Sequence, residues 1–124
     1  MAYSNVLFVD DDAWIHLGTC EFLRDNDLRV VEAWSAAEAC EVIDGDACLT
    51  ALVTDIDLGA GVDGYEIARR ARAAWPHLPI VYISGTSSAR HAAEGVALSQ
   101  FVRKPFDPQQ ILDALGRATC LEAA

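Results

Sequence analysis

Five short apolar segments limit the possible folds of this chain more than any other feature of its sequence. They cover residues 6–9, 28–31, 51–54, 80–83 and 99–102. The first, third and fourth segments are apolar throughout rather than alternating, which is typical of strands buried on both faces of a parallel sheet. The second and fifth segments are more mixed, so we expect them at or near the edges of that sheet.

Helical segments with recognisable start signals separate these strands. Ser35 and Glu38 have the spacing of a capping box, Asp63 stands at a similar position, and Pro108 occupies a predicted first helical turn. The predicted helices cover residues 12–24, 35–43, 64–74, 88–96 and 107–118. A strand followed by a helix, repeated five times, predicts an α/β fold with a doubly wound five-stranded parallel sheet, a (βα)5 three-layer sandwich.

Composition narrows the functional classes. The chain has 124 residues, enough for one domain, and a formal net charge of −10. Such a charge disfavours binding to nucleic acids and to anionic membranes. No apolar run approaches the roughly 20 residues of a membrane span, and residues 1–5 do not resemble a signal peptide. We therefore expect a cytoplasmic location and a single domain over residues 1–124 without an output domain.

Polar residues with matching chemistry follow four of the predicted strands. They are Asp10 and Asp11, then Asp55, then Ser84, and finally Lys104. In doubly wound folds the carboxyl ends of the strands form the functional site, so these side chains are expected to converge. Clustered carboxylates repel each other unless a cation is bound, which predicts a magnesium site. Asp55 is best placed to accept a phosphoryl group, with Lys104 and Ser84 contacting the phosphoryl oxygens.

In these motifs the chain resembles the receiver domain of response regulators, the CheY-like family of two-component signalling. The motifs are residues 6–12 (VLFVDDD), 52–55 (LVTD), 63–64 (DG), 83–85 (ISG) and 104–106 (KPF). The resemblance covers essentially the whole chain. It implies the flavodoxin-like strand order 2-1-3-4-5.

The resemblance also implies a role for each site residue. Asp55 is similar to the aspartate that accepts the phosphoryl group. Asp11 resembles the main Mg²⁺ (or Mn²⁺) ligand, with Asp10 assisting and the backbone carbonyl of Asp57 as a third protein ligand. Ser84 and Lys104 match the family's hydroxyl residue and phosphate-binding lysine. Phe101 takes the position of an aromatic rotamer switch.

The implied function is signal reception rather than enzymatic turnover. A histidine kinase or a histidine phosphotransfer protein would donate the phosphoryl group, and a downstream protein would bind the switched surface of the fourth helix, fifth strand and fifth helix. The same surface could form a homodimer. Asp57 and Thr86 are expected to tune dephosphorylation. The loop between Asp55 and Gly64 contains two glycines, and it is one residue longer than is common in the family that the chain resembles.

Three alternatives remain open. One is a receiver-like scaffold that does not take phosphate, although no expected site residue is missing from this sequence. A phosphatase of the haloacid-dehalogenase type would use Asp55 and Asp57 as its DxD motif, although that motif normally follows the first strand. A flavodoxin-like nucleotide binder would need a glycine-rich phosphate loop after the first strand, and the sequence has aspartates there.

Some residues outside the site carry weaker expectations. Trp14 and Leu17 fall beside the apolar stripe of the first helix, so they either form a partner-docking patch or, for Trp14, pack on a loop. The three histidines (His16, His77, His91) and three arginines (Arg69, Arg70, Arg72) are expected at the surface. The four cysteines (Cys20, Cys40, Cys48, Cys120) are expected to be reduced packing thiols without a metal role.

Overall fold

Five parallel strands form one sheet in this computed structural model, which describes residues 5–45, 47–59, 62–85 and 95–123, with side chains to residue 119. The strands are β1 (Val6–Val9), β2 (Val30–Ala33), β3 (Ala51–Asp55), β4 (Ile80–Ser84) and β5 (Gln100–Arg103). Their order in the sheet is β2-β1-β3-β4-β5. The predicted fold class and strand order are therefore confirmed, and the two mixed segments are the edge strands.

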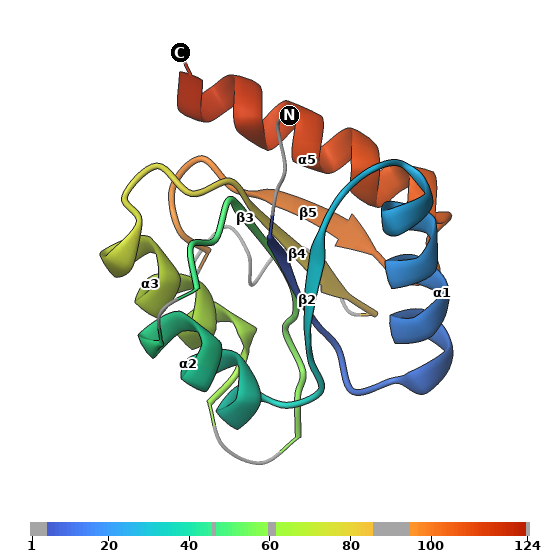
Figure 1. Cartoon of the computed structure of the whole chain (residues 1–124), viewed down its shortest axis with the longest axis horizontal. Coiled ribbons are helices and arrows are strands. Elements are labelled where there is room, and N and C mark those ends of the chain that lie inside the picture. The colour runs from blue at the N-terminus through green and yellow to red at the C-terminus, as the bar shows by residue number, and fades with distance from the viewer. Residues whose placement is uncertain (1–4, 46, 60–61, 86–94, 124) are drawn as a thin grey trace.

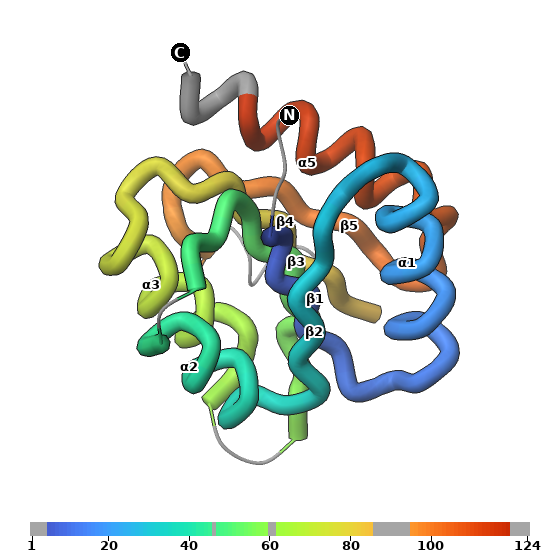
Figure 2. Tube along the Cα trace, in the orientation of Figure 1, coloured from blue at the N-terminus to red at the C-terminus, as the bar shows by residue number. Residues whose placement is uncertain are grey.

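Helices cover both faces of the sheet (Figure 1). They are α1 (Ala13–Asp25), α2 (Ala36–Asp44), α3 (Gly64–Ala74) and α5 (Pro108–Ala123). Figure 1 shows α1 and α5 on one face and α2 and α3 on the other, and the Cα trace in Figure 2 follows the same layers. In the predicted helix 88–96, residues 88–94 lie outside the described residues, and residues 95–96 are not helical.

Two apolar cores lie on opposite sides of the sheet because successive side chains of a strand point in opposite directions. Leu7 and Val9 of β1 belong to the core beneath α2 and α3. Val6 and Phe8 of the same strand belong to the core beneath α1 and α5. Burial on both faces explains why β1, β3 and β4 are apolar in sequence.

The second strand begins two residues later than predicted. Leu28 was expected in a strand over 28–31, but it lies in the turn that closes the C-terminal end of α1. Its backbone N–H donates to the Leu23 carbonyl at 3.2 Å, and that of Asp27 donates to the Arg24 carbonyl at 3.0 Å. Asp27 has φ +69. These bonds form a Schellman motif, which is often accompanied by an apolar contact of the kind that buried Leu28 makes here.

The predicted helix starts are found at Ser35, Asp63 and Pro108, each within one residue. The Ser35 hydroxyl accepts from the Glu38 N–H, and the Glu38 carboxylate reaches back to the Trp34 N–H at 2.8 Å. One arginine expected on the solvated face of α3, Arg72, is only partly exposed. The guanidinium of Arg72 donates to the carbonyls of Leu78 and Ala97, so it fastens α3 to the segment before β5.

Candidate functional site

The acidic residues predicted to converge do so at the carboxyl ends of the strands. Asp10 directly follows β1, Asp55 ends β3, Ser84 ends β4, and Lys104 directly follows β5. Asp10 and Ser84 are fully buried, and Asp55 is only 3 % exposed. These residues are distant in sequence, and the parallel order of β1, β3, β4 and β5 brings them to one edge.

Lys104 connects the two buried carboxylates. Its ammonium nitrogen Nζ lies 3.0 Å from Oδ2 of Asp55 and 3.2 Å from Oδ2 of Asp10. Each carboxylate also accepts one backbone N–H through its other oxygen. Oδ1 of Asp10 accepts from Asp12 at 2.8 Å, and Oδ1 of Asp55 accepts from Asp57 at 3.2 Å. The cation and two loop amides therefore hold both carboxylates in fixed orientations.

Burial dominates the electrostatics of this pocket. Burial and the nearby charge of Asp10 raise the pKa of Asp55 to about 6, although Lys104 and the Asp57 N–H oppose the rise. Burial also raises the pKa of Asp10, against the opposing effects of the Asp12 N–H and Lys104. Burial alone would lower the pKa of Lys104, but its hydrogen bond to Asp55 and its ion pairs with Asp55 and Asp10 raise it overall. Keeping both carboxylates ionised in this pocket therefore costs free energy, and an added positive charge would reduce that cost.

Gly64 brings the start of α3 against the end of β3. A Cβ atom at Gly64 would lie 2.3 Å from the Asp55 carbonyl oxygen and 2.8 Å from Cα of Ile56. The N–H of Gly64 donates to the Ile56 carbonyl at 2.9 Å. From the sequence, Gly64 was expected in a helix start and in a motif of the resembled family, not in a close packing contact. The sequence shows only that Gly64 directly follows the Asp63 cap. That position does not reveal how closely its backbone approaches Asp55 and Ile56.

The donor set fits a hard divalent cation. Carboxylate oxygens of Asp10, Asp11 and Asp55 lie within 4.8 Å of one another. Oδ2 of Asp10 is buried, and it has no hydrogen-bond partner among the described residues, because its contact with Lys104 lacks hydrogen-bond geometry. Asp11 is exposed and opens this group toward solvent. Oxygen ligands with access to water are what Mg²⁺ requires.

The remaining predicted site residues lie around this pocket. The Ser84 carbonyl accepts from the Lys104 N–H at 2.8 Å, which ties β4 to the lysine. Phe101 is half-buried against the core beneath α2 and α3. Asp57 contacts Asp55 through its N–H, whereas the expectation concerned its carbonyl. Thr86 lies outside the described residues.

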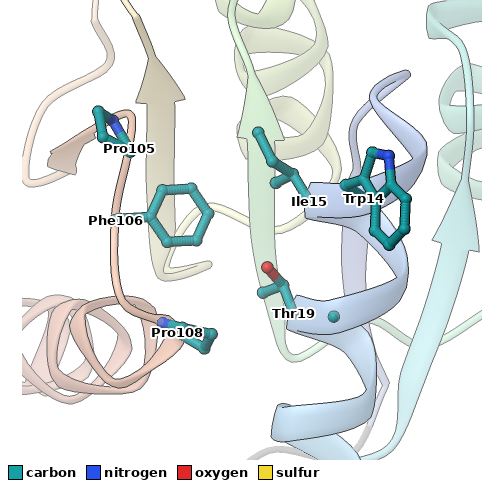
Figure 3. Close-up of a pocket in the computed structure, with 7 residues that line it drawn as sticks. Trp14, Ile15, Thr19, Pro105, Phe106 and Pro108 are labelled. Atoms are coloured by element: carbon teal, nitrogen blue, oxygen red, sulfur yellow. The ribbon is translucent and has the colours of Figure 1, made fainter.

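A hollow of about 280 Å³ lies beside the site, between α1 and the segment that leads from β5 into α5. Figure 3 shows the Phe106 ring projecting from that segment toward Ile15 and Thr19 of α1. Trp14 lies at its border and is 91 % exposed, so it does not pack on a loop, and Leu17 is 58 % exposed. These apolar side chains remain in solvent, as the docking-patch hypothesis requires.

His16 was expected at the surface, and this prediction is wrong. Its side chain is fully buried. It stacks on Trp34 with a ring separation of 3.7 Å and meets Phe8 edge-on. A lone polar residue on α1 gave no sign of this burial, because the ring partners come from β1 and from the end of β2. His77 is exposed as expected, and His91 lies outside the described residues.

The cysteines follow expectation only in part. Cys20, Cys40 and Cys48 are free thiols. Cys20 is buried in the core beneath α1 and α5, as predicted for a packing thiol. Cys48 is exposed, so it does not pack, because it lies in the loop before β3. The side chain of Cys120 lies outside the described part of the chain.

Comparison with known proteins gives one consistent result. Residues 6–116 match the family model of the response regulator receiver domain. A response regulator receiver protein of Anaeromyxobacter is 33 % identical over 109 residues, covering 88 % of this chain and 43 % of the relative. The response regulator protein FleR of Pseudomonas aeruginosa is 25 % identical over 116 residues, covering 92 % of this chain and 24 % of the relative. The chain thus spans less than half of these relatives' length.

Comparison with solved structures leads to the same family. A response regulator receiver protein from Sinorhizobium medicae superposes with a TM-score of 0.92 at 33 % identity, covering 97 % of both chains. The chemotaxis response regulator CheY4 of Vibrio cholerae superposes with a TM-score of 0.81 at 25 % identity, covering 94 % of this chain and 98 % of that one.

Within the described residues, no helix combines the length and the apolar character needed to cross a membrane.

Proposed function

The chain belongs to the response regulator receiver domain family of two-component systems, and from this premise we propose that it accepts a phosphoryl group on Asp55. The single observation that carries the proposal is the buried Asp55 carboxylate, held at 3.0 Å from the Lys104 ammonium. Receiver domains are generally not turnover enzymes. The product in this proposal is therefore a modified protein that signals, not a released metabolite.

The phosphoryl donor in this proposal is a phosphohistidine on a histidine kinase or a histidine phosphotransfer protein. A carboxylate oxygen of Asp55 attacks phosphorus, the bond from phosphorus to the donor's imidazole nitrogen breaks, and the imidazole leaves with that electron pair. The N–H of Asp57 and the ammonium of Lys104 orient the two carboxylate oxygens beforehand. Lys104 then pairs with the negative phosphoryl oxygens, and the Ser84 hydroxyl donates to one of them.

Asp10, Asp11 and Asp55 would hold the divalent cation, Mg²⁺ or Mn²⁺, with the Asp57 carbonyl as a further ligand. Such a cation offsets negative charge on a phosphoryl group in transfer. The fit rests on the buried Oδ2 of Asp10 and on the spacing of the carboxylate oxygens. In the unphosphorylated protein, the bound cation is first expected to reduce the repulsion between the Asp10 and Asp55 carboxylates.

The output in this proposal is a surface change. Phosphorylation adds about −1.5 to −2 charges at Asp55. Ser84 and Lys104 move toward that charge, and half-buried Phe101, which has no hydroxyl, turns inward by packing alone. A surface that includes β5 and α5, together with the predicted fourth helix, then binds a downstream protein; residues 88–94 of that helix lie outside the described residues. A homodimer through the same surface is a further prediction. The single-domain organisation and the cytoplasmic location also stay predictions.

The docking surface for the phosphoryl donor is proposed to be the hollow between α1 and the start of α5. It borders the site because Pro105 and Phe106 directly follow Lys104. Ile15 on the opposite wall (Figure 3) and Trp14 at the border of the hollow are apolar, and Trp14 is 91 % exposed. An amphipathic helix of the donor would cover these side chains and bring its phosphohistidine over Asp55.

The test is labelling by a small phosphoryl donor. Incubation with acetyl phosphate and Mg²⁺ should add one phosphoryl group to the intact mass of the native protein. The Asp55→Asn variant should remain unlabelled, and so should the native protein in EDTA. Asp44→Asn is the matched control, because Asp44 is an exposed aspartate that pairs with Arg70 far from the site; it should label normally.

The proposal fails if Asp55→Asn is labelled at the native rate. It also fails if the folded native protein binds Mg²⁺ but is labelled neither by acetyl phosphate nor by phosphoramidate. The second result would favour the scaffold that does not take phosphate. Turnover of a generic phosphate ester would instead favour the phosphatase alternative.

A further inference from the structure

Three unlike metal-binding groups meet next to the acidic pocket but outside the carboxylate group of Asp10, Asp11 and Asp55. His16 and Cys20 lie on α1, four residues apart and therefore on one face of the helix, and Glu32 lies on β2. A ring nitrogen of His16, Sγ of Cys20 and a carboxylate oxygen of Glu32 lie within 4.8 Å of one another. His16 and Cys20 are buried, and the Glu32 side chain is 27 % exposed.

The hydrogen bonds of His16 fix its ring so that Nε2 faces the Glu32 carboxylate. Nδ1 lies 2.8 Å from the backbone carbonyl of Asp10, which can only accept, so Nδ1 carries a hydrogen. Nε2 lies 2.9 Å from Oε1 of Glu32. Histidines that bind metals commonly donate the other ring N–H to a carbonyl in this way, which fixes the ring orientation. The Glu32 carboxylate can only accept, so Nε2 donates to it, and a metal ion that binds Nε2 must displace that hydrogen.

The donor set selects a borderline-soft ion. Imidazole nitrogen, thiolate sulfur and carboxylate oxygen are ligands of Zn²⁺, with bonds of about 2.0–2.3 Å. In a tetrahedral site such bonds place neighbouring ligand atoms roughly 3.3–3.6 Å apart. The 2.9 Å separation of His16 and Glu32 must therefore open by about 0.5 Å. The partly exposed Glu32 side chain can make this adjustment by rotation.

An open surface hollow reaches two of the three groups. This hollow of about 400 Å³ is bordered by Cys20 and Glu32. Its rim also carries Glu21 and Asp25, so its acidic side chains outnumber its single cation, Arg24. Arg24 holds Oε2 of Glu32 at 2.9 Å, which leaves Oε1 directed at His16. The hollow has room for a water molecule as a fourth ligand.

We propose that His16, Cys20 and Glu32 form a Zn²⁺-binding site that joins α1 to β2. Burial raises the pKa of the Cys20 thiol to about 12, so the thiol carries its proton until a metal replaces it. Zn²⁺ takes the place of the hydrogen between Nε2 of His16 and Oε1 of Glu32, and this proton and the thiol proton of Cys20 are released to solvent. The site depends on neither Asp55 nor phosphorylation.

Cadmium provides a direct readout, because thiolate-bound Cd²⁺ has an ultraviolet charge-transfer band. The protein for the test carries serine at Cys40, Cys48 and Cys120, so Cys20 is its only thiol. Titration with Cd²⁺ in saturating Mg²⁺ should produce this band at one ion per chain, and added Zn²⁺ should remove it. The matched control keeps exposed Cys48 and has serine at Cys20, Cys40 and Cys120; it should give no stoichiometric band.

Two further variants assign the ligands. His16→Gln in the Cys20-only protein should weaken Cd²⁺ binding by at least 10-fold, whereas Asp55→Asn should leave the band unchanged. The midpoint temperature of the Cys20-only protein should rise with Zn²⁺, and that of the Cys48-only control in saturating Mg²⁺ should not. Circular dichroism confirms that each variant is folded. A folded Cys20-only protein without the band, or unchanged affinity in His16→Gln, would overturn the proposal.

Discussion

Replacing Asp55 with asparagine should stabilise the protein at neutral pH when no divalent cation is present. Asp55 is buried beside Asp10, and its pKa of about 6 lies above the ordinary value of 3.8. A raised pKa means that the folded state disfavours the ionised carboxylate relative to the unfolded state. The difference corresponds to about 3 kcal/mol of unfolding free energy at pH values above both pKa values. Asparagine carries no charge, so the variant avoids this cost.

The sign of the pH dependence follows from the same shift. Between about pH 4 and 6 the folded state binds more protons at Asp55 than the unfolded state does. The unfolding free energy of the native protein therefore falls as the pH rises through this window. This contribution of Asp55 is absent in Asp55→Asn. The unfolding free energy of the variant should therefore increase relative to that of the native protein as the pH rises. At pH 7.5 the gain of up to about 3 kcal/mol corresponds to roughly 10 °C in Tm.

Urea unfolding in EDTA at pH 4, 5, 6 and 7.5, followed by tryptophan fluorescence, measures the difference. The m-value should stay constant, because the surface exposed on unfolding does not change. Asp44→Asn, at an exposed position, should follow the native curve within about 0.5 kcal/mol. The reasoning is refuted if Asp55→Asn is less stable than the native protein at pH 7.5, or if their difference does not vary with pH.

Three other outcomes are expected. Mg²⁺ should raise the Tm of the native protein and that of Asp11→Asn much less, because Asp11 belongs to the carboxylate group that fits the cation; equal shifts in thermal melts would contradict this. Gly64→Ala should lose about 2–3 kcal/mol in urea unfolding, since a Cβ there would meet the Asp55 carbonyl, and a neutral result would refute the close approach. Trp14→Ala should slow phosphoryl transfer from a histidine phosphotransfer partner about 10-fold, as expected for a lost interface anchor; labelling by acetyl phosphate should be unchanged, and equal slowing with both donors would show that Trp14 acts inside the site.

Much of the fold could be read from local patterns. The apolar runs at 6–9, 51–54 and 80–83 become the strands buried on both faces. The mixed runs become edge strands, where one side lacks a neighbour. The helix starts depend on residues three or four apart, so Ser35 and Asp63 could be identified from spacing alone. Leu28 was misplaced because an apolar residue that closes a helix end has the same local pattern as the start of a strand.

The sequence also determined which residues share the acidic pocket. Once strands are recognised as parallel, their carboxyl ends must meet at one edge, and Asp10, Asp55, Ser84 and Lys104 follow from their positions. Their order along the chain therefore suffices to predict convergence. It does not determine which atoms touch, such as Lys104 against both carboxylates.

Only the tertiary structure decided the surroundings of His16 and Gly64. The position of His16 on α1 is compatible with exposure or burial, and its burial depends on Phe8, Glu32 and Trp34 from other elements. The importance of Gly64 depends on how closely α3 approaches β3. Periodicity and capping act over a few residues, whereas these contacts depend on packing between segments whose separation in space the local sequence does not encode.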